Sequence, residues 1–453
     1  MQNSKNTITG KDFIIKSSVL SAGVCLACAF PTLLIGCSNK KHSGTLENNY
    51  TSQKQKLLEK ITYLEKYTKV LFLVILLVIN GNLTAQNPTE NLVTELQKTL
   101  DSIQQEVNFP GITCAVILPY DCIIKLASGY SDSDKNIKMK NTHRMFSGST
   151  EKTFVSAVLL QLVEEDKLSL NDKVSKYLGE NGWYKKIPNS ADLTINMLAH
   201  HTGGLPRYIL NEKFNTGVLA DVNKIWTPEE RLSYIFDMEP IHPAGNGWYY
   251  SDTDYILLGM IIEKVCGNTL YSEVQNRFIK PLNLNTIEPA ISRNPSGLAQ
   301  GHSGENPYIN APVKVVKNGK YFINPQFEWC GGGFIGSSPD LAKWAKLFFS
   351  GSIFNDESKV KLYSTVDFET GKESEYGYGI ATIISETTLG KKIGHTGLMM
   401  GYLTELAYYP KYDFAIAIQI NQDDFQGEKK NLGEYSLKFA EIVSKQLNNI
   451  KSR

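Results

Sequence analysis

The spacing of apolar residues predicts a helix and then a β-hairpin at the start of the segment 87–450. Apolar residues recur at helical spacing in 91–106, at Leu92, Leu96, Leu100 and Ile103. The next segment, 111–130, is rich in β-branched and apolar residues and contains Pro119-Tyr120-Asp121. Such a pattern is typical of two strands joined by a turn.

The pattern changes twice more along the chain. Residues from about 150 to 350 are mostly helical and loop in character. The last third returns to strand-like runs at 376–385, 402–410 and 414–421 and ends with an amphipathic helix at 433–447. Strands at both ends with helices between them predict an α/β fold in which a sheet is interrupted by a mostly helical insertion. No proline-rich linker, low-complexity tract or repeat divides 87–450, so we expect a single domain there.

Two apolar segments precede this domain. The leader 1–37 ends in Leu34-Ile35-Gly36-Cys37, which resembles the lipobox at which bacterial lipoproteins are cleaved and acylated on cysteine. The alternative for this leader is an ordinary signal peptide that ends near a cysteine.

The region 38–86 is predicted to be a linker with a second apolar stretch at 70–79. That stretch is short for a membrane span of about 20 residues and suits a signal-peptide core, or it persists as a membrane-associated helix. Either leader predicts an exported, periplasmic protein associated with the membrane, with Cys37 as the lipidation site.

The composition disfavours several classes of binding partner. Lys and Arg number 47 against 46 for Asp and Glu, so no basic surface excess favours nucleic acid as a partner. The cysteines show no zinc-ligand spacing, and we expect neither a metal nor an organic cofactor.

A disulfide between Cys114 and Cys122 is not expected, because folding the hairpin about Tyr120 puts Cys114 opposite Lys125 or Leu126. The sequence says nothing of oligomeric state.

The first chemical motif is Ser149-Thr150-Glu151-Lys152 at a predicted helix start. Helical i,i+3 spacing places the Ser149 and Lys152 side chains on one face, with Cβ atoms about 5–6 Å apart. A serine hydroxyl needs a proton acceptor to become a nucleophile, and a desolvated lysine can take the proton or hold the acceptor. The alternative is a helix cap at Ser149 with a surface Lys152.

The second motif is Tyr250-Ser251-Asp252, which precedes an apolar helix. A tyrosine at this place can present its phenol to a cleft. Beside a lysine ammonium its pKa is expected to fall, so that the phenolate serves as general base. The alternative is an aromatic packing cluster with Trp248 and Tyr249.

The third motif is Gly394-His395-Thr396-Gly397, between two strand-like segments. The glycine after Thr396 lets the backbone of an edge strand approach a ligand closely. His395 and Thr396 are then candidates to contact a substrate carboxylate or to assist proton movement. A second His-Thr-Gly, at 201–203, is interpreted as structural, and the loop that contains it and Arg207 is expected near the cleft. The glycines at 331–333 are interpreted as close packing.

These motifs, in this order, resemble the β-lactamase-related serine hydrolases, which include class C β-lactamases, D-Ala-D-Ala carboxypeptidases, D-aminopeptidases and certain esterases. The resemblance covers nearly all of 90–450. It rests on GSTEKTF, QLVEEDKLSLNDKVSKYL, LTINMLAHHTGGLPRY, GWYYSDTDYILLGMIIEKVCG, GGGFIGSSPDLAKWAKLF and GHTGLMMGYLTELAYYP. It implies the β-lactamase/transpeptidase-like fold, an antiparallel sheet flanked by helices.

The resemblance also implies roles. Ser149 corresponds to the acylated nucleophile, Lys152 to its proton-handling partner, Tyr250 to the general base and His395 to the first residue of the K/H-T-G motif. Backbone N–H groups of Ser149 and Leu398 correspond to the oxyanion hole, with Asp252, Thr396 and Gly397 around the substrate.

Two departures from the family pattern bear on the substrate. Asp252 stands where asparagine is usual, and a carboxylate cannot donate to a substrate carbonyl. It can instead pair with Lys152 or favour a substrate amine. His395 stands where class C β-lactamases have lysine, which removes a positive charge from the carboxylate site.

The sequence therefore predicts a serine hydrolase that cleaves a small peptide or ester through an acyl-enzyme, like a D-Ala-D-Ala carboxypeptidase or an esterase. Two alternatives remain: a class C-like β-lactamase acting on β-lactams, and a catalytically silent protein that binds peptidoglycan or peptides.

Overall fold

The computed structural model describes residues 88–304, 309–423 and 432–451. The predictions for 1–37 and 38–86, Cys37 included, lie outside the described residues. Within the described ranges no helix is long and apolar enough to cross a membrane.

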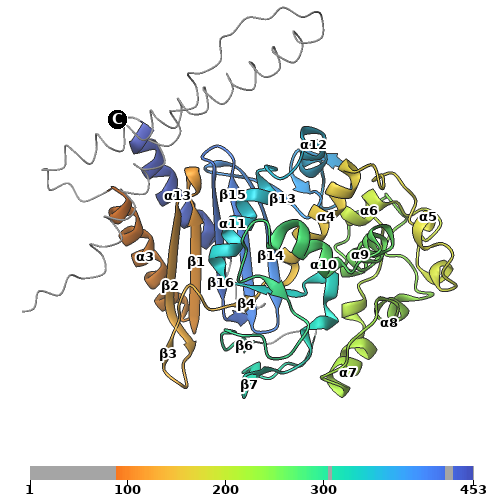
Figure 1. Cartoon of the computed structure of the whole chain (residues 1–453), viewed down its shortest axis with the longest axis horizontal. Coiled ribbons are helices and arrows are strands. Elements are labelled where there is room, and N and C mark those ends of the chain that lie inside the picture. Colours follow the sequence, from red (N-terminus) through yellow and green to blue (C-terminus); the bar gives the residue numbers. More distant parts are fainter. Residues whose placement is uncertain (1–87, 305–308, 424–431, 452–453) are drawn as a thin grey trace, which may run out of the picture. The chain divides into compact units, whose positions relative to one another are not determined.

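A ten-stranded sheet with antiparallel pairing forms the centre of the described part (Figure 1). Its order is β11-β10-β12-β13-β14-β15-β16-β1-β2-β3, so the first strands of the domain pair with the last ones. The strands are β1 (Gly111–Ile117), β2 (Ile123–Asp132), β3 (Ile137–Lys138), β10 (Thr365–Val366), β11 (Glu373–Ser374), β12 (Gly377–Tyr378), β13 (Ile383–Thr387), β14 (Gly390–Met399), β15 (Tyr402–Tyr409) and β16 (Phe414–Ile420). This arrangement confirms the predicted sheet built from both ends of the domain.

Both faces of the sheet are covered by helices, which explains why β1 and β16 are buried along their whole length. Along β1, Cys114 and Val116 belong to one buried cluster, and Ala115 and Ile117 to another. The first cluster is closed by α3 (Pro88–Val107) and α13 (Leu432–Lys451), and α11 (Ser338–Phe349) packs against β16 and β1. In Figure 1, α3 and α13 lie on the side of the sheet away from the helical insertion.

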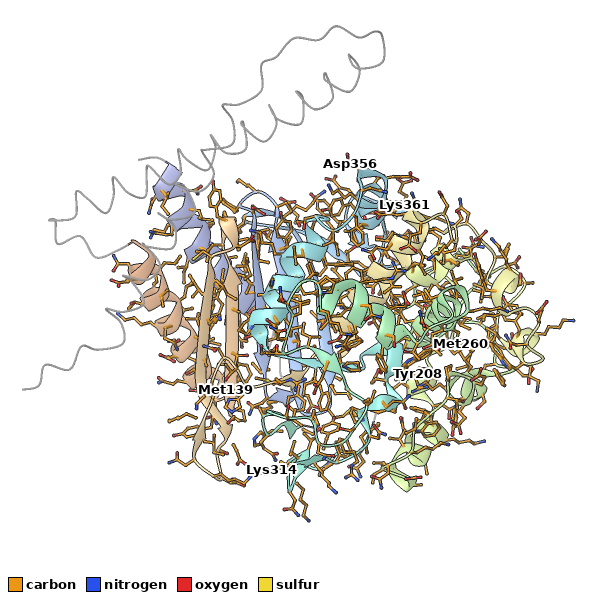
Figure 2. The ribbon with its side chains drawn as sticks, viewed as in Figure 1. Met139, Tyr208, Met260, Lys314, Asp356 and Lys361 are labelled. Atoms are coloured by element: carbon orange, nitrogen blue, oxygen red, sulfur yellow. The ribbon has the colours of Figure 1, made fainter. Side chains whose placement is uncertain are left out.

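The insertion is mostly helical, as predicted. Its two central helices, α4 (Lys152–Glu164) and α9 (Asp252–Cys266), are buried along most of their length. Around them lie α5 (Ser175–Leu178), α6 (Ile195–Ala199), α7 (Glu212–Ala220), α8 (Pro228–Leu232), α10 (Leu270–Val274) and α12 (Asp356–Tyr363). In Figure 2, Tyr208 and Met260 lie among the side chains of this part, whereas Asp356 and Lys361 lie on α12 at its margin.

Short strands connect the sheet to the insertion. One small sheet has the order β4-β9-β5, and its strand β4 leads directly into the predicted nucleophile segment. The short strands are β4 (Met145–Phe146), β5 (Glu288–Pro289), β6 (His302–Ser303), β7 (Val316–Lys317), β8 (Lys320–Tyr321), β9 (Phe334–Gly336) and β17 (Gln422–Asp423).

The hairpin prediction is confirmed at the level of register. Cys114 lies opposite Leu126, and both Cys114 and Cys122 are free thiols. The turn at 119–121 is a short 3-10 helix in which Tyr120 and Asp121 adopt positive φ.

Two local predictions are wrong. The strand expected over 376–385 is broken into β12 and β13, because Gly379 donates its N–H to the Thr382 carbonyl and the chain turns there. The His395 motif does not lie between strands but inside β14, a central strand that pairs on both sides.

Candidate active site

Ser149 lies on a 3-10 turn, η2 (Gly148–Glu151), between β4 and the start of α4. Gly148 takes φ 54° there, and a side chain at this position would collide with the backbone of Leu398. The turn is held by the Ser147 N–H, which donates to the Phe334 carbonyl on β9. The α-helix thus begins one turn later than predicted, and Ser149 remains partly accessible at its N-terminal end.

Lys152 is fully buried, so the surface alternative for this residue is wrong. Its ammonium donates to Ser149 Oγ at 3.1 Å, to Asp252 Oδ1 at 2.8 Å and to the Gly331 carbonyl at 2.6 Å. Those three bonds use all the protons of an ammonium. Burial lowers the pKa of Lys152, but the neighbouring Asp252 carboxylate raises it by more, so the net pKa is above the usual value. Lys152 is therefore a cation in the resting site.

Asp252, the first residue of α9, forms ion pairs with two cations, Lys152 and Arg207. Its Oδ1 accepts from Lys152, and its Oδ2 accepts from Arg207 Nε at 3.0 Å and Nη2 at 2.6 Å. Burial raises the pKa of Asp252, yet Arg207 and Lys152 outweigh it and hold that pKa below its ordinary value. Of the two interpretations of this aspartate, the pair with Lys152 is formed. Arg207 was placed near the cleft by its loop, but the sequence did not reveal that it pairs with Asp252.

Tyr250 places its ring 5.0 Å from the Lys152 ammonium. Its buried hydroxyl has no hydrogen-bond partner among the described residues. The expectation that a neighbouring lysine lowers its pKa is wrong in net effect. Burial raises the pKa of Tyr250 more than the Lys152 charge lowers it, so the resting side chain is a neutral phenol.

His201 contacts the segment around Tyr250 and holds it in place. This histidine is fully buried and takes φ 60°. His201 Nδ1 lies 2.7 Å from Asp254 Oδ2, and its carbonyl accepts from the Tyr249 N–H. Its ring centroid is 4.3 Å from that of Tyr250. These contacts agree with the structural interpretation of the His-Thr-Gly at 201–203.

Strand β14 forms the opposite wall, and its pairing explains how it reaches the nucleophile. The ladder with β13 ends at Gly394, whereas the ladder with β15 continues to Met399. Beyond Gly394 the strand therefore has one edge that β13 does not cover. A Cβ on Gly397 would lie 1.9 Å from the Ser147 carbonyl oxygen, so the strand backbone contacts the η2 turn directly. The close approach expected of this glycine is present, although β14 is not an edge strand.

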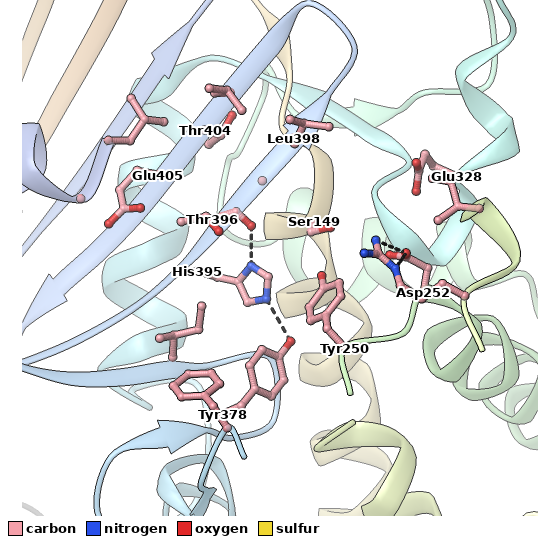
Figure 3. Close-up of a pocket in the computed structure, with 18 of the residues that line it drawn as sticks. Ser149, Tyr250, Asp252, Glu328, Tyr378, His395, Thr396, Leu398, Thr404 and Glu405 are labelled. Atoms are coloured by element: carbon pink, nitrogen blue, oxygen red, sulfur yellow. Dashed lines mark hydrogen bonds and ion pairs between the residues drawn. The ribbon is translucent and has the colours of Figure 1, made fainter. Parts of the chain in front are cut away.

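His395 is neutral in this site. Burial and then the Lys152 charge lower its pKa to about 3. Its Nδ1 lies 2.6 Å from the Thr396 carbonyl and therefore carries the proton, and its Nε2 accepts from the Tyr378 hydroxyl at 2.9 Å (Figure 3). His395 thus brings no permanent positive charge to a substrate carboxylate.

This burial predicts a pH effect on stability. The unfolded chain protonates His395 below about pH 6.5, whereas the folded chain resists protonation down to about pH 3, so stability falls as pH decreases through that window. Its share at pH 4.5 is about 2–3 kcal/mol. We expect His395→Gln to flatten the fall measured by urea unfolding between pH 7 and 4.5. An unchanged slope in His395→Gln would contradict a neutral buried imidazole.

A second prediction concerns the contact of β14 with the nucleophile turn. Gly397→Ala adds a methyl group where the Ser147 carbonyl lies, and must push the strand and the Leu398 N–H away from Ser149. Loss of one oxyanion donor costs about 10²–10³ in kcat, and we expect a fall of that size in steady-state hydrolysis. Gly182→Ala is the matched control, because nothing lies within 4 Å of a Cβ there. Equal activity of the two variants would show that the approach of β14 is not needed.

A cavity of about 570 Å³ brings the predicted residues together. All of those around the substrate line it, and Lys152 contacts Ser149 from the protein interior. The lining includes Ser149, Tyr250, Asp252, His395, Thr396, Gly397 and Leu398, together with Arg207, Glu328, Trp248, Tyr378, Lys392, Thr404 and Glu405. In Figure 3, His395, Thr396 and Glu405 lie on one side of Ser149, and Asp252 and Glu328 on the other.

Within the second set, the residues not predicted from the sequence are those outside the three motifs and their neighbouring segments, namely Glu328, Tyr378, Lys392, Thr404 and Glu405. Glu405 forms an ion pair with Lys392 at 2.9 Å across β14 and β15, a juxtaposition set by strand register. Among the described residues no group of three or more His, Cys, Asp or Glu side chains is placed to hold a metal ion.

Comparison with known proteins agrees with this geometry. The family model described as Beta-lactamase matches residues 96–440. The putative penicillin-binding protein PbpX of Bacillus subtilis is 24% identical over 299 residues, 65% of this chain and 68% of PbpX. A D-stereospecific amidohydrolase from Streptomyces sp. has a solved structure with TM-score 0.62 and 26% identity, covering 72% of this chain and 94% of that one.

A third relative is the octameric penicillin-binding protein homologue from Pyrococcus abyssi, with TM-score 0.62 and 25% identity over 78% of this chain and 77% of that one. The fold is thus the β-lactamase/transpeptidase-like one expected from the motifs. Since the family model spans more than half of the sequence, the chain belongs to the beta-lactamase family, whose members are serine hydrolases.

Proposed function

We propose that this protein hydrolyses an amide bond through an acyl-enzyme at Ser149, with preference for a D-configured amino-acid residue. One observation carries the proposal: a cationic lysine, anchored by Asp252, donates to the hydroxyl of an accessible serine at 3.1 Å. The D-preference is supported by the likeness to the D-stereospecific amidohydrolase.

In the proposed reaction the phenolate of Tyr250 takes the proton of Ser149 Oγ, and Oγ attacks the carbonyl carbon. Backbone N–H groups of Ser149 and Leu398 stabilise the oxyanion. Tyr250 then gives its proton to the leaving nitrogen, which departs as an amine, and a water molecule hydrolyses the ester at Ser149.

The raised pKa of Tyr250 sets the pH dependence of this mechanism. Its phenol must lose a proton before it can act as a base, so kcat/KM should rise with pH on the alkaline side. Lys152 stays cationic there because its own pKa is also raised, and it stabilises the phenolate.

The test uses the full-length chain with D- and L-phenylalaninamide, and ammonia release is measured. We expect the D-enantiomer to be hydrolysed at least about tenfold faster, a difference of about 1.4 kcal/mol. Ser149→Ala is the matched inactive control. Hydrolysis of a simple ester but of neither amide would favour an esterase. Rapid turnover of a chromogenic cephalosporin would favour a β-lactamase, and no turnover of any substrate would favour a silent binding protein.

The charges in the cavity make β-lactam turnover the weaker candidate. His395 is neutral, and Lys392, which lines that wall, is paired with Glu405. A carboxylate arriving beside Thr396 therefore has no uncommitted cation to meet among these side chains.

A further inference from the structure

Glu328 is an acidic side chain of the cavity that none of the three motifs contains. It lies directly before η8 (Trp329–Gly331), lines the same cavity as Ser149 and is 6% exposed. Its backbone N–H donates to the Pro325 carbonyl. Within the described ranges, its carboxylate makes neither a hydrogen bond nor an ion pair, although it is more than nine-tenths buried.

The basic groups of this region are already committed elsewhere. Lys152 and Arg207 both bind Asp252. Arg231 is fully buried and donates to three backbone carbonyls, those of Trp226, Gln326 and Phe327. Glu328 therefore carries a buried acidic group that no cation of the described residues contacts directly, and the more distant charges of Lys152, Arg207 and Arg231 offset its burial only in part.

Glu328 and Asp252 converge on one point of the cavity wall. A Cβ built on Gly331 would lie 2.8 Å from Glu328 Oε2 and 3.6 Å from Asp252 Oδ1, so both oxygens lie beside this glycine. Both carboxylates lie on the side of Ser149 opposite to Thr396 (Figure 3). The Asp252 oxygens are occupied by cations of the protein, which leaves the Glu328 oxygens to a ligand.

We propose that Glu328 binds the ammonium group of the substrate, so that the site selects amides with a free primary amine close to the scissile carbonyl, such as an amino-acid amide or the first residue of a short peptide. This inference rests on the proposed amide hydrolysis and adds the chemical class of the substrate. The substrate ammonium places a positive charge against the Glu328 carboxylate, which no cation of the described residues contacts directly. A charge-assisted hydrogen bond then forms between the two groups.

The titration of Glu328 agrees with this role. Burial, and then the charge of Asp252, raises its pKa to about 7. Below that pH the carboxyl group is neutral and attracts an ammonium weakly. The KM for an amine-bearing substrate should therefore rise as pH falls below 7, whereas the KM for an uncharged substrate should not.

The experiment compares D-alanine p-nitroanilide with propionic acid p-nitroanilide, which has the same carbon skeleton without the amine. In the full-length chain, Glu328→Gln keeps the size of the side chain and removes its charge. A hydrogen bond to a charged group contributes about 1.5–3 kcal/mol, so we expect KM for the amine to rise about 10- to 100-fold. The kcat for the amine, and both constants for the propionyl compound, should stay within about twofold. Glu229→Gln, at an exposed acid, is the matched control.

Binding separates this inference from the proposed function. In a Ser149→Ala background, calorimetry with D-alaninamide and propionamide needs no turnover. Tighter binding of the alaninamide, lost on adding Glu328→Gln, supports the inference even if no amide is hydrolysed. Equal binding of the two ligands, or an equal loss for both in Glu328→Gln, overturns it even if the enzyme is active.

Discussion

Replacing Ser149 with alanine is expected to lower kcat/KM by roughly 10⁴- to 10⁶-fold and to abolish every covalent adduct. Ser149 Oγ is the partly accessible hydroxyl that Lys152 contacts, and the cavity opens onto it. Without Oγ no acyl-enzyme forms, and only the oxyanion donors and binding contacts are left to act on the substrate. The measurement is intact-protein mass after incubation with a β-lactam or a slow ester, together with steady-state kinetics.

Two other serines of the chain help to control for this result. Ser147 is fully buried and paired with Glu151, so it cannot reach a substrate. Ser352 is exposed and lies outside the cavity, and Ser352→Ala should keep both activity and adduct. An adduct of the same mass on Ser149→Ala would show that another nucleophile reacts, and would overturn the acyl-enzyme at Ser149.

The sequence predicted well the features that depend on short spacing. Ser149 and Lys152 are three residues apart, so one turn of helix decides their contact, whether it is α-helical or 3-10. Cys114 faces Leu126 because a hairpin with a known turn has one register. The sheet made from both ends of the domain was also predictable, because the strand-like runs lie at those ends.

Features that depend on contacts between distant segments were not predictable. Glu328 reaches the cavity from a loop far in sequence from all three motifs, and nothing in its local pattern marks it. The pairing of Arg207 with Asp252 joins a loop of the insertion to the first residue of α9. The pKa of Tyr250 was misjudged because a spacing argument counts the nearby charge of Lys152 but not the burial of the hydroxyl.

Lys152→Met is expected to abolish activity and to destabilise the fold at the same time. Methionine has similar volume but leaves Asp252 buried with Arg207 as its remaining cation. Removing one partner of a buried ion pair costs about 3–5 kcal/mol, and we expect the lower end because Arg207 stays. The kcat should fall by at least about 10³-fold, because neither the Ser149 hydroxyl nor the Tyr250 phenolate keeps its cation. Urea unfolding and amide hydrolysis measure the two effects.

A double variant separates these two effects. Lys152→Met with Asp252→Asn removes both charges of the pair, so no buried carboxylate is left in need of Lys152. Part of the lost stability should return, although Arg207 loses the Asp252 carboxylate. Activity should not return, since the group that contacts Ser149 Oγ is still absent. If the double variant recovers stability and activity together, Lys152 acts through the fold alone and the proposed proton transfer is wrong. If stability recovers while hydrolysis stays lost, the Lys152 ammonium serves both as the internal partner of Asp252 and as the cation that makes Ser149 reactive.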